Sequence, residues 1–528
     1  MRRSIRGATA ALATLALTVG AFAAPAVAQD ESTFIFGGQQ EPATLDPFAA
    51  VFVDEEQVIG QIFEQLVYLD EQLQPVPGLA TSWERNADAT EYTFTLRDGV
   101  IFHNGDVLDA AAVKAHFDRL LDDADVPGSV TSAIKASYAG STVIDPLTVR
   151  LEFSAPQSGL LLNLGKPGGA ITNAAAVAQQ GPDAGSNPIG SGPFRFQEWV
   201  QGSEIRLVRN DDWTWGNADY FGTSGPANLD GITFRYLTDA QTRTASIESG
   251  DVDMIEQVPH QNLGSLRENP DLQIVGAKFP GLPQGNFLNM QRPPFDDINV
   301  RRAVFHATDR DTIISLVYFD EVEATYSPIT QNFPQYQADL AEMYPYDPDK
   351  ARALLEEAGW VIGDAGVREK DGERLTVRIL ENRGWNEWVT VLQDQLRDVG
   401  FDAQIHTEEG GGYFASSASG VNELVSMGSI DANPVQIGSY LHSDQLSVGT
   451  NGGLNDPVLD QIFQDMQEEL DPAVLDQMLI DFQTYVMEQA YYLPIFQFNF
   501  FTAMDKDLSG LVVDGTQFYK YFANMSRS

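Results

Sequence analysis

Apolar and polar side chains alternate strictly at residues 92–96, where apolar residues occupy every second position and threonines fill the places between them. A period of two predicts a β-strand with one buried face. Asp98-Gly99 and the apolar residues 100–102 follow directly. We therefore expect a tight hairpin whose second strand is short.

The pattern then changes to a helical period. Asp109 can accept hydrogen bonds from the first free N–H groups of a helix that follows it. An apolar residue recurs on one face of that helix at Val113, Phe117, Leu120 and Leu121. This spacing predicts a helix with a single buried face.

Three later helices are predicted to begin in a shared way, with an N-capping acid before a proline at the first helical position. The pairs are Asp347-Pro348, Asp456-Pro457 and Asp471-Pro472. Gly359 can end the first of these helices in the left-handed conformation.

A helix and a strand also follow one another closely before and after residue 400. The helix is expected from Asn386 to Gly400, and residues 401–405 alternate as a strand. Helices that alternate with strands predict the α/β fold class, here in one large globular unit with internal lobes.

The N-terminus has the three-part layout of a secretory signal peptide. The sequence MRRSIRG precedes an apolar run from Ala8 to Ala24, and Ala26-Val27-Ala28 offers a small-residue cleavage site. We expect residues 1–28 to be removed after general secretion, because the residues after Arg2-Arg3 fit a twin-arginine signal poorly.

Cysteine is absent from the chain. A lipid anchor would need a cysteine at the cleavage site, so we expect a free periplasmic protein and not a lipoprotein. Zinc or iron–sulfur sites built on thiolates are excluded for the same reason. No cofactor is expected.

The formal charge of the full chain is −43. Residues 1–28 hold three arginines and no acid, so their removal leaves −46. A body of this charge repels nucleic acid and anionic membrane surfaces, and neither is expected as a partner. The acids are dispersed among apolar residues, which favours a solvated acidic surface over a cation-binding one.

Familiar catalytic motifs are missing: the sequence has no G-x-S-x-G elbow, no His-Glu-x-x-His and no P-loop. Residues 410–415 fit a G-x-G-x-x-A pattern, but Glu408 and Glu409 would repel a pyrophosphate, so a flexible loop is expected. Binding is therefore favoured over catalysis. A secreted hydrolase that uses scattered acids is the alternative from another class, and a metal site built from distant histidines also stays open.

Residues 77–121 hold their elements in a fixed order: a segment with Trp83, the alternating strand, the turn, a short strand, the motif His103-Asn104-Gly105-Asp106, and the helix. This order resembles the signature region of the peptide/nickel family (family 5) of extracellular solute-binding proteins, the capture subunits of ABC importers. We expect a structural role for His103 and Asp106. Further segments resemble the same family in the same order, at residues 44–47, 62–67, 188–194, 205–210, 248–253, 295–303, 346–351 and 491–495.

The resemblance implies a two-lobed periplasmic binding protein fold of type II with an additional inserted domain, which makes three domains and a discontinuous lobe I. By the positions of the matching segments, lobe I comprises residues 29–63, 189–285 and 504–528, the inserted domain 64–188, and lobe II 286–503. Two strands that cross between the lobes would act as the hinge. The implied function is capture of a small solute outside the cytoplasm by a monomer, and delivery to ABC permease subunits in the inner membrane.

Aromatic side chains are the first candidates for the ligand site, because solute pockets are walled largely by such rings. Trp385 and Tyr413 lie in glycine-flanked contexts, and Phe498 lies on an alternating segment near the C-terminus. Phe52 is a further candidate.

Residues 426–434, SMGSIDANP, give the most discriminating comparison. In peptide-binding relatives the corresponding segment has Trp, two small residues and an Asp that pairs with the peptide's α-amino group. Here Met427 takes the Trp position, Ile430 falls where the Asp would be, and Asp431 comes one residue later. A loop bulge could leave Asp431 as the ammonium partner, whereas on a regular strand its carboxylate would face the opposite side. Met427, Asp431 and Asn433 are the candidates from this segment.

The ligand class follows from the charges near this segment. Residues 421–425 offer no Arg or Lys to receive a ligand carboxylate, which disfavours an anionic solute there. We expect a peptide-like or other neutral or cationic small solute. A metal-complex or haem receptor and an oligosaccharide receptor of the same fold are the alternatives.

Overall fold

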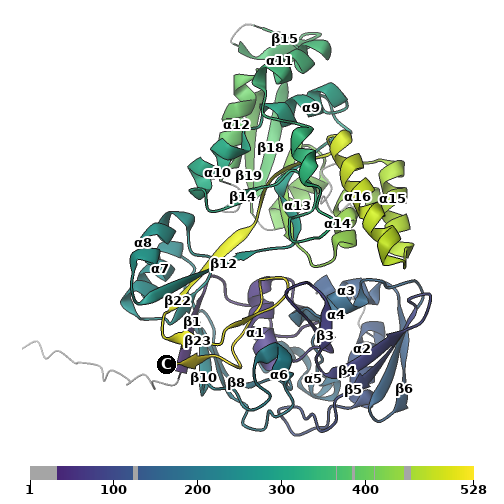
Figure 1. Ribbon diagram of the computed structural model, residues 1–528, viewed down its shortest axis with the longest axis vertical. Coiled ribbons are helices and arrows are strands. Elements are labelled where there is room, and N and C mark those ends of the chain that lie inside the picture. The colour runs from purple at the N-terminus through teal and green to yellow at the C-terminus, as the bar shows by residue number, and fades with distance from the viewer. Residues whose placement is uncertain (1–32, 123–128, 364–365, 383–386, 410, 445–453) are drawn as a thin grey trace, which may run out of the picture.

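The computed structural model describes residues 33–122, 129–363, 366–382, 387–409, 411–444 and 454–528 (Figure 1). The signal peptide expected over residues 1–28 and the candidate Trp385 lie outside the described residues. None of the described helices is long and apolar enough to cross a membrane.

A seven-stranded sheet lies in the lower part of Figure 1 and gathers three separate stretches of the chain. In spatial order its strands are β12 (Leu272–Lys278), β22 (Asn499–Asp505), β11 (Met254–Ile255), β1 (Thr33–Gly38), β10 (Gly231–Tyr236), β9 (Glu204–Arg209) and β8 (Phe194–Val200). β1 is parallel to both of its neighbours, and the other pairs are antiparallel. The helices α7 (Ala240–Ser249) and α8 (Leu263–Glu268) lie beside its β12 edge.

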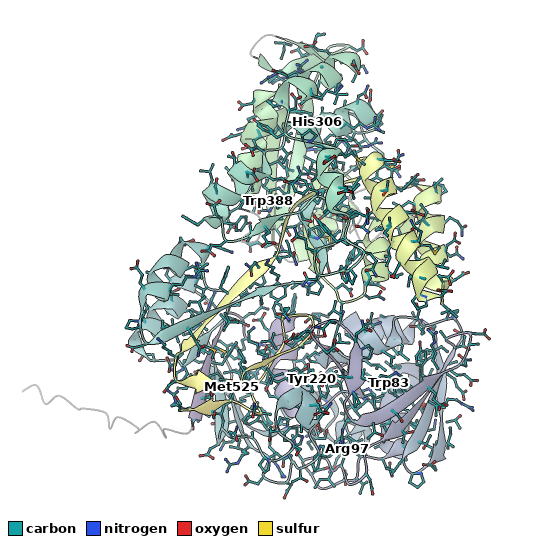
Figure 2. All side chains as sticks on the ribbon, viewed as in Figure 1. Trp83, Arg97, Tyr220, His306, Trp388 and Met525 are labelled. Carbon is teal, nitrogen blue, oxygen red and sulfur yellow. The ribbon has the colours of Figure 1, made fainter. Side chains whose placement is uncertain are left out.

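A six-stranded sheet forms the centre of the upper part. Its strands, in spatial order, are β14 (Glu323–Ala324), β21 (Tyr492–Gln497), β13 (Gly281–Leu288), β20 (Leu424–Ile430), β18 (Thr376–Asn382) and β19 (Asp402–Glu408). Here β18 is parallel to β19 and β20. Trp388, labelled in Figure 2, is fully buried in this part and lies edge-on to Phe496.

Helices surround the six-stranded sheet (Figure 1). They are α9 (Ile298–Ala307), α10 (Arg310–Tyr318), α11 (Pro348–Glu357), α12 (Val389–Asp398), α13 (Gly411–Ala418), α14 (Pro434–Leu441), α15 (Pro457–Glu468) and α16 (Pro472–Glu488). Together with the parallel strands, they confirm the predicted α/β class.

A four-stranded antiparallel sheet forms a third part, built wholly from residues 80–153. Its order is β4 (Ala80–Arg85), β5 (Glu91–Leu96), β7 (Thr148–Phe153) and β6 (Tyr138–Asp145), and α2 (Ala110–Asp122) packs on it. The short elements β2 (Val67–Leu69), β3 (Pro75–Pro77), α3 (Ser129–Lys135), α4 (Leu160–Leu164) and α5 (Ala174–Gln180) adjoin it. The residue bounds of the three expected domains stay a prediction.

Two chain segments cross side by side between the seven-stranded and the six-stranded sheet. β12 continues into β13, and β21 continues into β22; the two segments are antiparallel partners in both sheets. The crossing points are Phe279-Pro280 and Phe498, and the Phe279 N–H donates to the Phe498 carbonyl over 3.1 Å. Paired crossings of this kind can serve as a hinge.

The hairpin predicted after residue 96 is wrong. The turn at Asp98-Gly99 forms, but residues 100–102 do not pair with β5, and Ile101 instead bridges to Val107. The reason is that both edges of β5 are already occupied, one by β4 and the other by β7. The alternation itself is confirmed, since Tyr92, Phe94 and Leu96 are buried.

The helix starts predicted at the three Asp-Pro pairs and at Asp109 are confirmed, whereas Asn386, where a further start was predicted, lies outside the described residues and α12 begins at Val389. Each Asp-Pro pair begins a helix whose aspartate accepts a backbone N–H, at α11, α15 and α16. Asp109 likewise accepts from the N–H groups of Ala111 and Ala112, over 2.9 and 3.0 Å. Gly359 has the expected left-handed φ of 88°. Leu121 departs from the predicted apolar face, because it is 55% exposed.

The loop expected over residues 410–415 is also wrong, because α13 begins at Gly411. The ring of Tyr413 is buried, and its hydroxyl donates to the carbonyl of Ser426 on β20 over 2.7 Å. Packing against the sheet thus stabilises a helix that its glycine-rich start would not form alone.

Candidate ligand-binding site

A cavity of about 480 Å³ lies between residues of the upper and the lower part of the molecule. The lower wall comes from the start of α1 (Val53–Ile62), from α3, from the turn after α4 and from residues 518–519. The upper wall comes from the end of β20 and from α13 and α14, and Phe498 and Phe500 line it where the chain crosses. This volume is in the range of pockets that enclose small organic solutes.

Aromatic rings dominate the wall. Eight of the described residues that line it are aromatic, namely Phe52, Tyr413, Phe414, Tyr440, Phe498, Phe500, Phe518 and Tyr519. Hydrogen bonds of their hydroxyl groups fix the tyrosine rings. The hydroxyl oxygen of Tyr440, for example, lies 2.7 Å from the Ser429 Oγ. Burial, with a smaller contribution from the Asp431 carboxylate, raises the pKa of Tyr440 to about 12, so its hydroxyl stays neutral. Fixed rings provide apolar surface without a large loss of side-chain entropy on binding.

Asp431 lies directly after β20. The strand is regular up to Ile430, and the irregularity in the pairing falls between Leu282 and Gly285 on β13. The Asp431 N–H donates to the Pro280 carbonyl over 3.0 Å. Both Ile430 and Asp431 line the cavity, because the chain leaves the strand geometry between them. On a regular strand, successive side chains point to opposite faces, which would have directed the Asp431 carboxylate away from the cavity. Asp431 lies beyond the end of the strand, so this alternation does not apply to it.

Lys166 reaches the same place from the lower wall. Its Nζ lies 3.4 Å from the Asp431 Oδ1, and the two side chains are only 14% and 10% exposed. The turn that holds Lys166 is closely packed: a Cβ at Gly165 would lie 2.6 Å from Leu69, and one at Gly168 would lie 2.5 Å from Glu56. Close packing thus fixes the turn from which the Lys166 side chain extends.

Glu56 is the third charged residue among the described residues that line the cavity. Its carboxylate accepts a hydrogen bond from the Tyr519 hydroxyl. Burial raises the pKa of Glu56 to about 7, and the Tyr519 hydrogen bond and the Lys166 charge oppose that rise. The described wall of the cavity therefore has one cation and two acids, of which one acid holds a proton for part of the time at neutral pH.

Five of the seven residues expected at the ligand line the cavity: Phe52, Tyr413, Met427, Phe498 and Asp431. Phe52 is 53% exposed. Asn433 is not among the lining residues, because its side chain accepts the Val435 N–H at the start of α14. It also lies so close to Gly159 that a Cβ there would collide with its Nδ2. Trp385 lies outside the described residues.

Sequence analysis missed Lys166, Glu56 and Tyr519. Residues 421–425 contain no Lys or Arg, and Lys166 is 265 positions from its partner Asp431. The run of residues 165–169, Gly-Lys-Pro-Gly-Gly, was an available signal, since three glycines and a proline around one lysine indicate a tightly fixed turn.

The residues of the family signature lie elsewhere. The N–H of His103 donates to the Gly190 carbonyl over 2.8 Å, and its Nε2 lies 3.0 Å from the Gly192 carbonyl. Burial lowers the pKa of His103 to about 4. Asp106 accepts from the Asn173 side chain over 2.8 Å. Neither lines the cavity, and the described residues contain no cluster of three or more His, Asp or Glu that could hold a metal ion.

Comparisons with known proteins agree with this architecture. The glutathione-binding protein GsiB of Salmonella paratyphi A is 29% identical over 404 residues, which are 76% of this chain and 74% of the relative. GsiB of Escherichia coli O157:H7 is 27% identical over 369 residues, 70% of this chain and 68% of the relative.

Two solved structures show the same fold. NikA of Brucella suis, in complex with Fe(III)-EDTA, superimposes with a TM-score of 0.83 at 24% identity and covers 94% of this chain and 100% of its own. The dipeptide-binding protein of Pseudoalteromonas sp. SM9913, in complex with Met-Leu, superimposes with a TM-score of 0.78 at 21% identity. It covers 94% of this chain and 100% of its own. The expected type II periplasmic binding protein fold is thereby confirmed. The model of the bacterial extracellular solute-binding proteins, family 5, matches residues 74–444, and the chain belongs to this family.

Proposed function

We propose that this protein encloses a peptide-like solute, neutral or cationic overall, in the cavity between its upper and lower walls, and delivers it to the permease subunits of an ABC importer. The observation that carries the proposal is the cavity itself: about 480 Å³, lined by aromatic rings, and positioned beside the two chain crossings. Rotation about these crossings would close the walls over a solute that binds the closed state better.

The names of the relatives support a peptide-like ligand. Two GsiB relatives are glutathione-binding proteins, and one neighbour in fold was solved with the dipeptide Met-Leu. In our proposal Asp431 takes the solute's ammonium group, while Tyr413, Met427, Phe498 and Phe52 contact the remainder. The protein acts as a monomer in the periplasm after removal of residues 1–28, and it performs no chemical step.

Thermal unfolding of the mature protein tests the proposal. A panel of glutathione, dipeptides, tetrapeptides, oligosaccharides and metal complexes should include a peptide that raises the Tm, because a ligand at 100 times its Kd stabilises by about 2.7 kcal/mol. The same peptide should compact the particle in small-angle scattering. If no peptide shifts either quantity, or if only a sugar or a metal complex does, the proposal is wrong.

A matched pair of variants tests the assigned role of Asp431. Asp431→Asn removes the charge at the cavity and should weaken peptide binding at least tenfold. Asp88→Asn makes the same chemical change at an exposed turn and should leave binding unchanged. Equal affinities for the two variants would show that Asp431 does not contact the solute.

A further inference from the structure

Lys166 and Asp431 join the two walls of the cavity by an ion pair. Their charged atoms are 3.4 Å apart, and both side chains are largely removed from water. A charge in such a place depends on a partner for compensation, since water no longer supplies it. Any solute that enters between the walls must therefore leave both charges compensated.

Both members of the pair are held in position and still have unused capacity. The Asp431 Oδ1 already accepts the N–H of Asn433 over 2.9 Å, and a carboxylate has further lone pairs on its second oxygen. The ammonium group of Lys166 has three N–H donors, and among the described residues Asp431 alone accepts a hydrogen bond from it. Each group can accordingly take a ligand atom of opposite charge.

The charge of the ligand decides what happens to the pair on insertion. A simple cation that binds Asp431 competes with Lys166 and leaves that ammonium with only the partly protonated Glu56 as a nearby acid. A simple anion that binds Lys166 leaves Asp431 uncompensated. A solute with both charges close together satisfies both groups at once, through charge-assisted hydrogen bonds on either side.

We propose that the solute is recognised by an α-amino-acid head group, with its ammonium and carboxylate on one carbon, which inserts between Lys166 and Asp431. The ammonium contacts Asp431 and the carboxylate contacts Lys166. This inference rests on the proposed function and narrows its ligand class. Peptides linked through a side chain, such as γ-glutamyl peptides, keep this head intact, whereas in ordinary α-linked peptides the two charges lie at opposite ends.

The remaining charged residue of the wall is consistent with this arrangement. Glu56 already accepts from the Tyr519 hydroxyl and lies on the Lys166 side of the cavity, next to Gly168. Among the described residues that line the cavity, the ligand carboxylate therefore has one cation available, and the ligand ammonium has Asp431 on the opposite wall. The rest of the solute faces aromatic rings, including Tyr440.

Two isomers with identical atoms test the head group. γ-Glutamyl-cysteinyl-glycinamide and α-glutamyl-cysteinyl-glycinamide, which are both neutral overall, are compared by isothermal titration against the mature protein, in the presence of a reductant. We expect the γ-linked isomer to bind with a Kd at least tenfold lower. Equal affinities, or binding of neither isomer, would overturn the head-group proposal.

Variants of Lys166 assign the discrimination to this residue. Lys166→Met should reduce the affinity for the γ-linked isomer at least tenfold, so that the Kd values of the two isomers differ by no more than about threefold. Lys166→Arg keeps the positive charge and should retain most of the preference for the γ-linked isomer. Lys114→Met, which changes a lysine of a partly exposed ion pair on α2, is the control and should retain the full preference. Preserved discrimination in Lys166→Met would refute the role of Lys166.

The outcomes separate this inference from the function on which it rests. If α-linked peptides raise the Tm and bind as well as γ-linked ones, the protein is a peptide receptor without the proposed head-group site. If no peptide of either kind binds, the proposed function fails as well.

Discussion

The buried carboxyl group of Glu56 makes the stability of this protein depend on pH in a defined direction. Its pKa is about 7 in the folded chain, against an ordinary value of 4.5, chiefly because the side chain is buried. Between these two values the folded state holds more protons than the unfolded state. Stability due to this group is therefore fully present below pH 4.5 and is lost as the pH rises to about 7.

The size of the effect follows from the two pKa values. A difference of about 2.5, at 1.36 kcal/mol for each pH unit, corresponds to roughly 3 kcal/mol. Glu56→Gln keeps the shape and the neutral state but cannot ionise, and its amide oxygen can still accept from Tyr519. We expect the variant to be more stable than the wild type by less than about 1 kcal/mol at pH 5 and by up to about 3 kcal/mol at pH 8.5.

Urea unfolding followed by tryptophan fluorescence at pH 5, 6, 7 and 8.5 measures this difference. Other buried acids, among them Glu64 with a pKa of about 7, contribute to the same pH range. The test is therefore the difference in unfolding free energy between the variant and the wild type at each pH, and not the pH dependence of the wild type alone. Glu71→Gln, at an exposed turn, is the control and should follow the wild type at every pH. If Glu56→Gln also follows the wild type, the argument from burial is refuted.

Three further changes have expected outcomes. Tyr519→Phe removes the hydrogen bond that opposes the raised pKa of Glu56, so the pH at which stability falls should move upward in the same urea series; a downward movement would contradict this. Gly190→Ala places a Cβ onto the Ile62 carbonyl oxygen and should cost about 1–3 kcal/mol in unfolding free energy, whereas Gly225→Ala, which meets no neighbouring atom, should cost little. Asp109→Ala removes the cap of α2 and should cost about 1 kcal/mol; an unchanged urea midpoint would show that the cap is dispensable.

Local features of the fold could be predicted from the sequence, because their causes are local. The Asp-Pro helix starts need only the aspartate oxygen, the proline ring and the next few N–H groups. The alternating strand at residues 92–96 needs only one buried face. The α/β class follows from such elements in succession, since each must bury its apolar side against another.

Features that depend on competition between distant segments could not be predicted in this way. The hairpin after β5 is absent because β7, some 50 residues later, takes the edge that the hairpin would have used. The helix α13 forms because Tyr413 bonds to β20. In the candidate site, Lys166 meets Asp431 across 265 positions, and nothing near either residue in the sequence indicates the other.

The acidity of the whole chain and the charge of the cavity are separate properties, and they favour different ligands. A surface that carries most of the formal charge of −43 attracts cations in general. At the cavity, however, Lys166 compensates Asp431, and the raised pKa of Glu56 leaves that acid partly neutral near pH 7. The electrostatic attraction of a simple cation to the cavity is therefore little stronger than its attraction to the acidic surface. Affinity has to come from a solute whose own charges match both members of the ion pair, so the separation of charge within the solute, and not its net charge, is the property that this site can select.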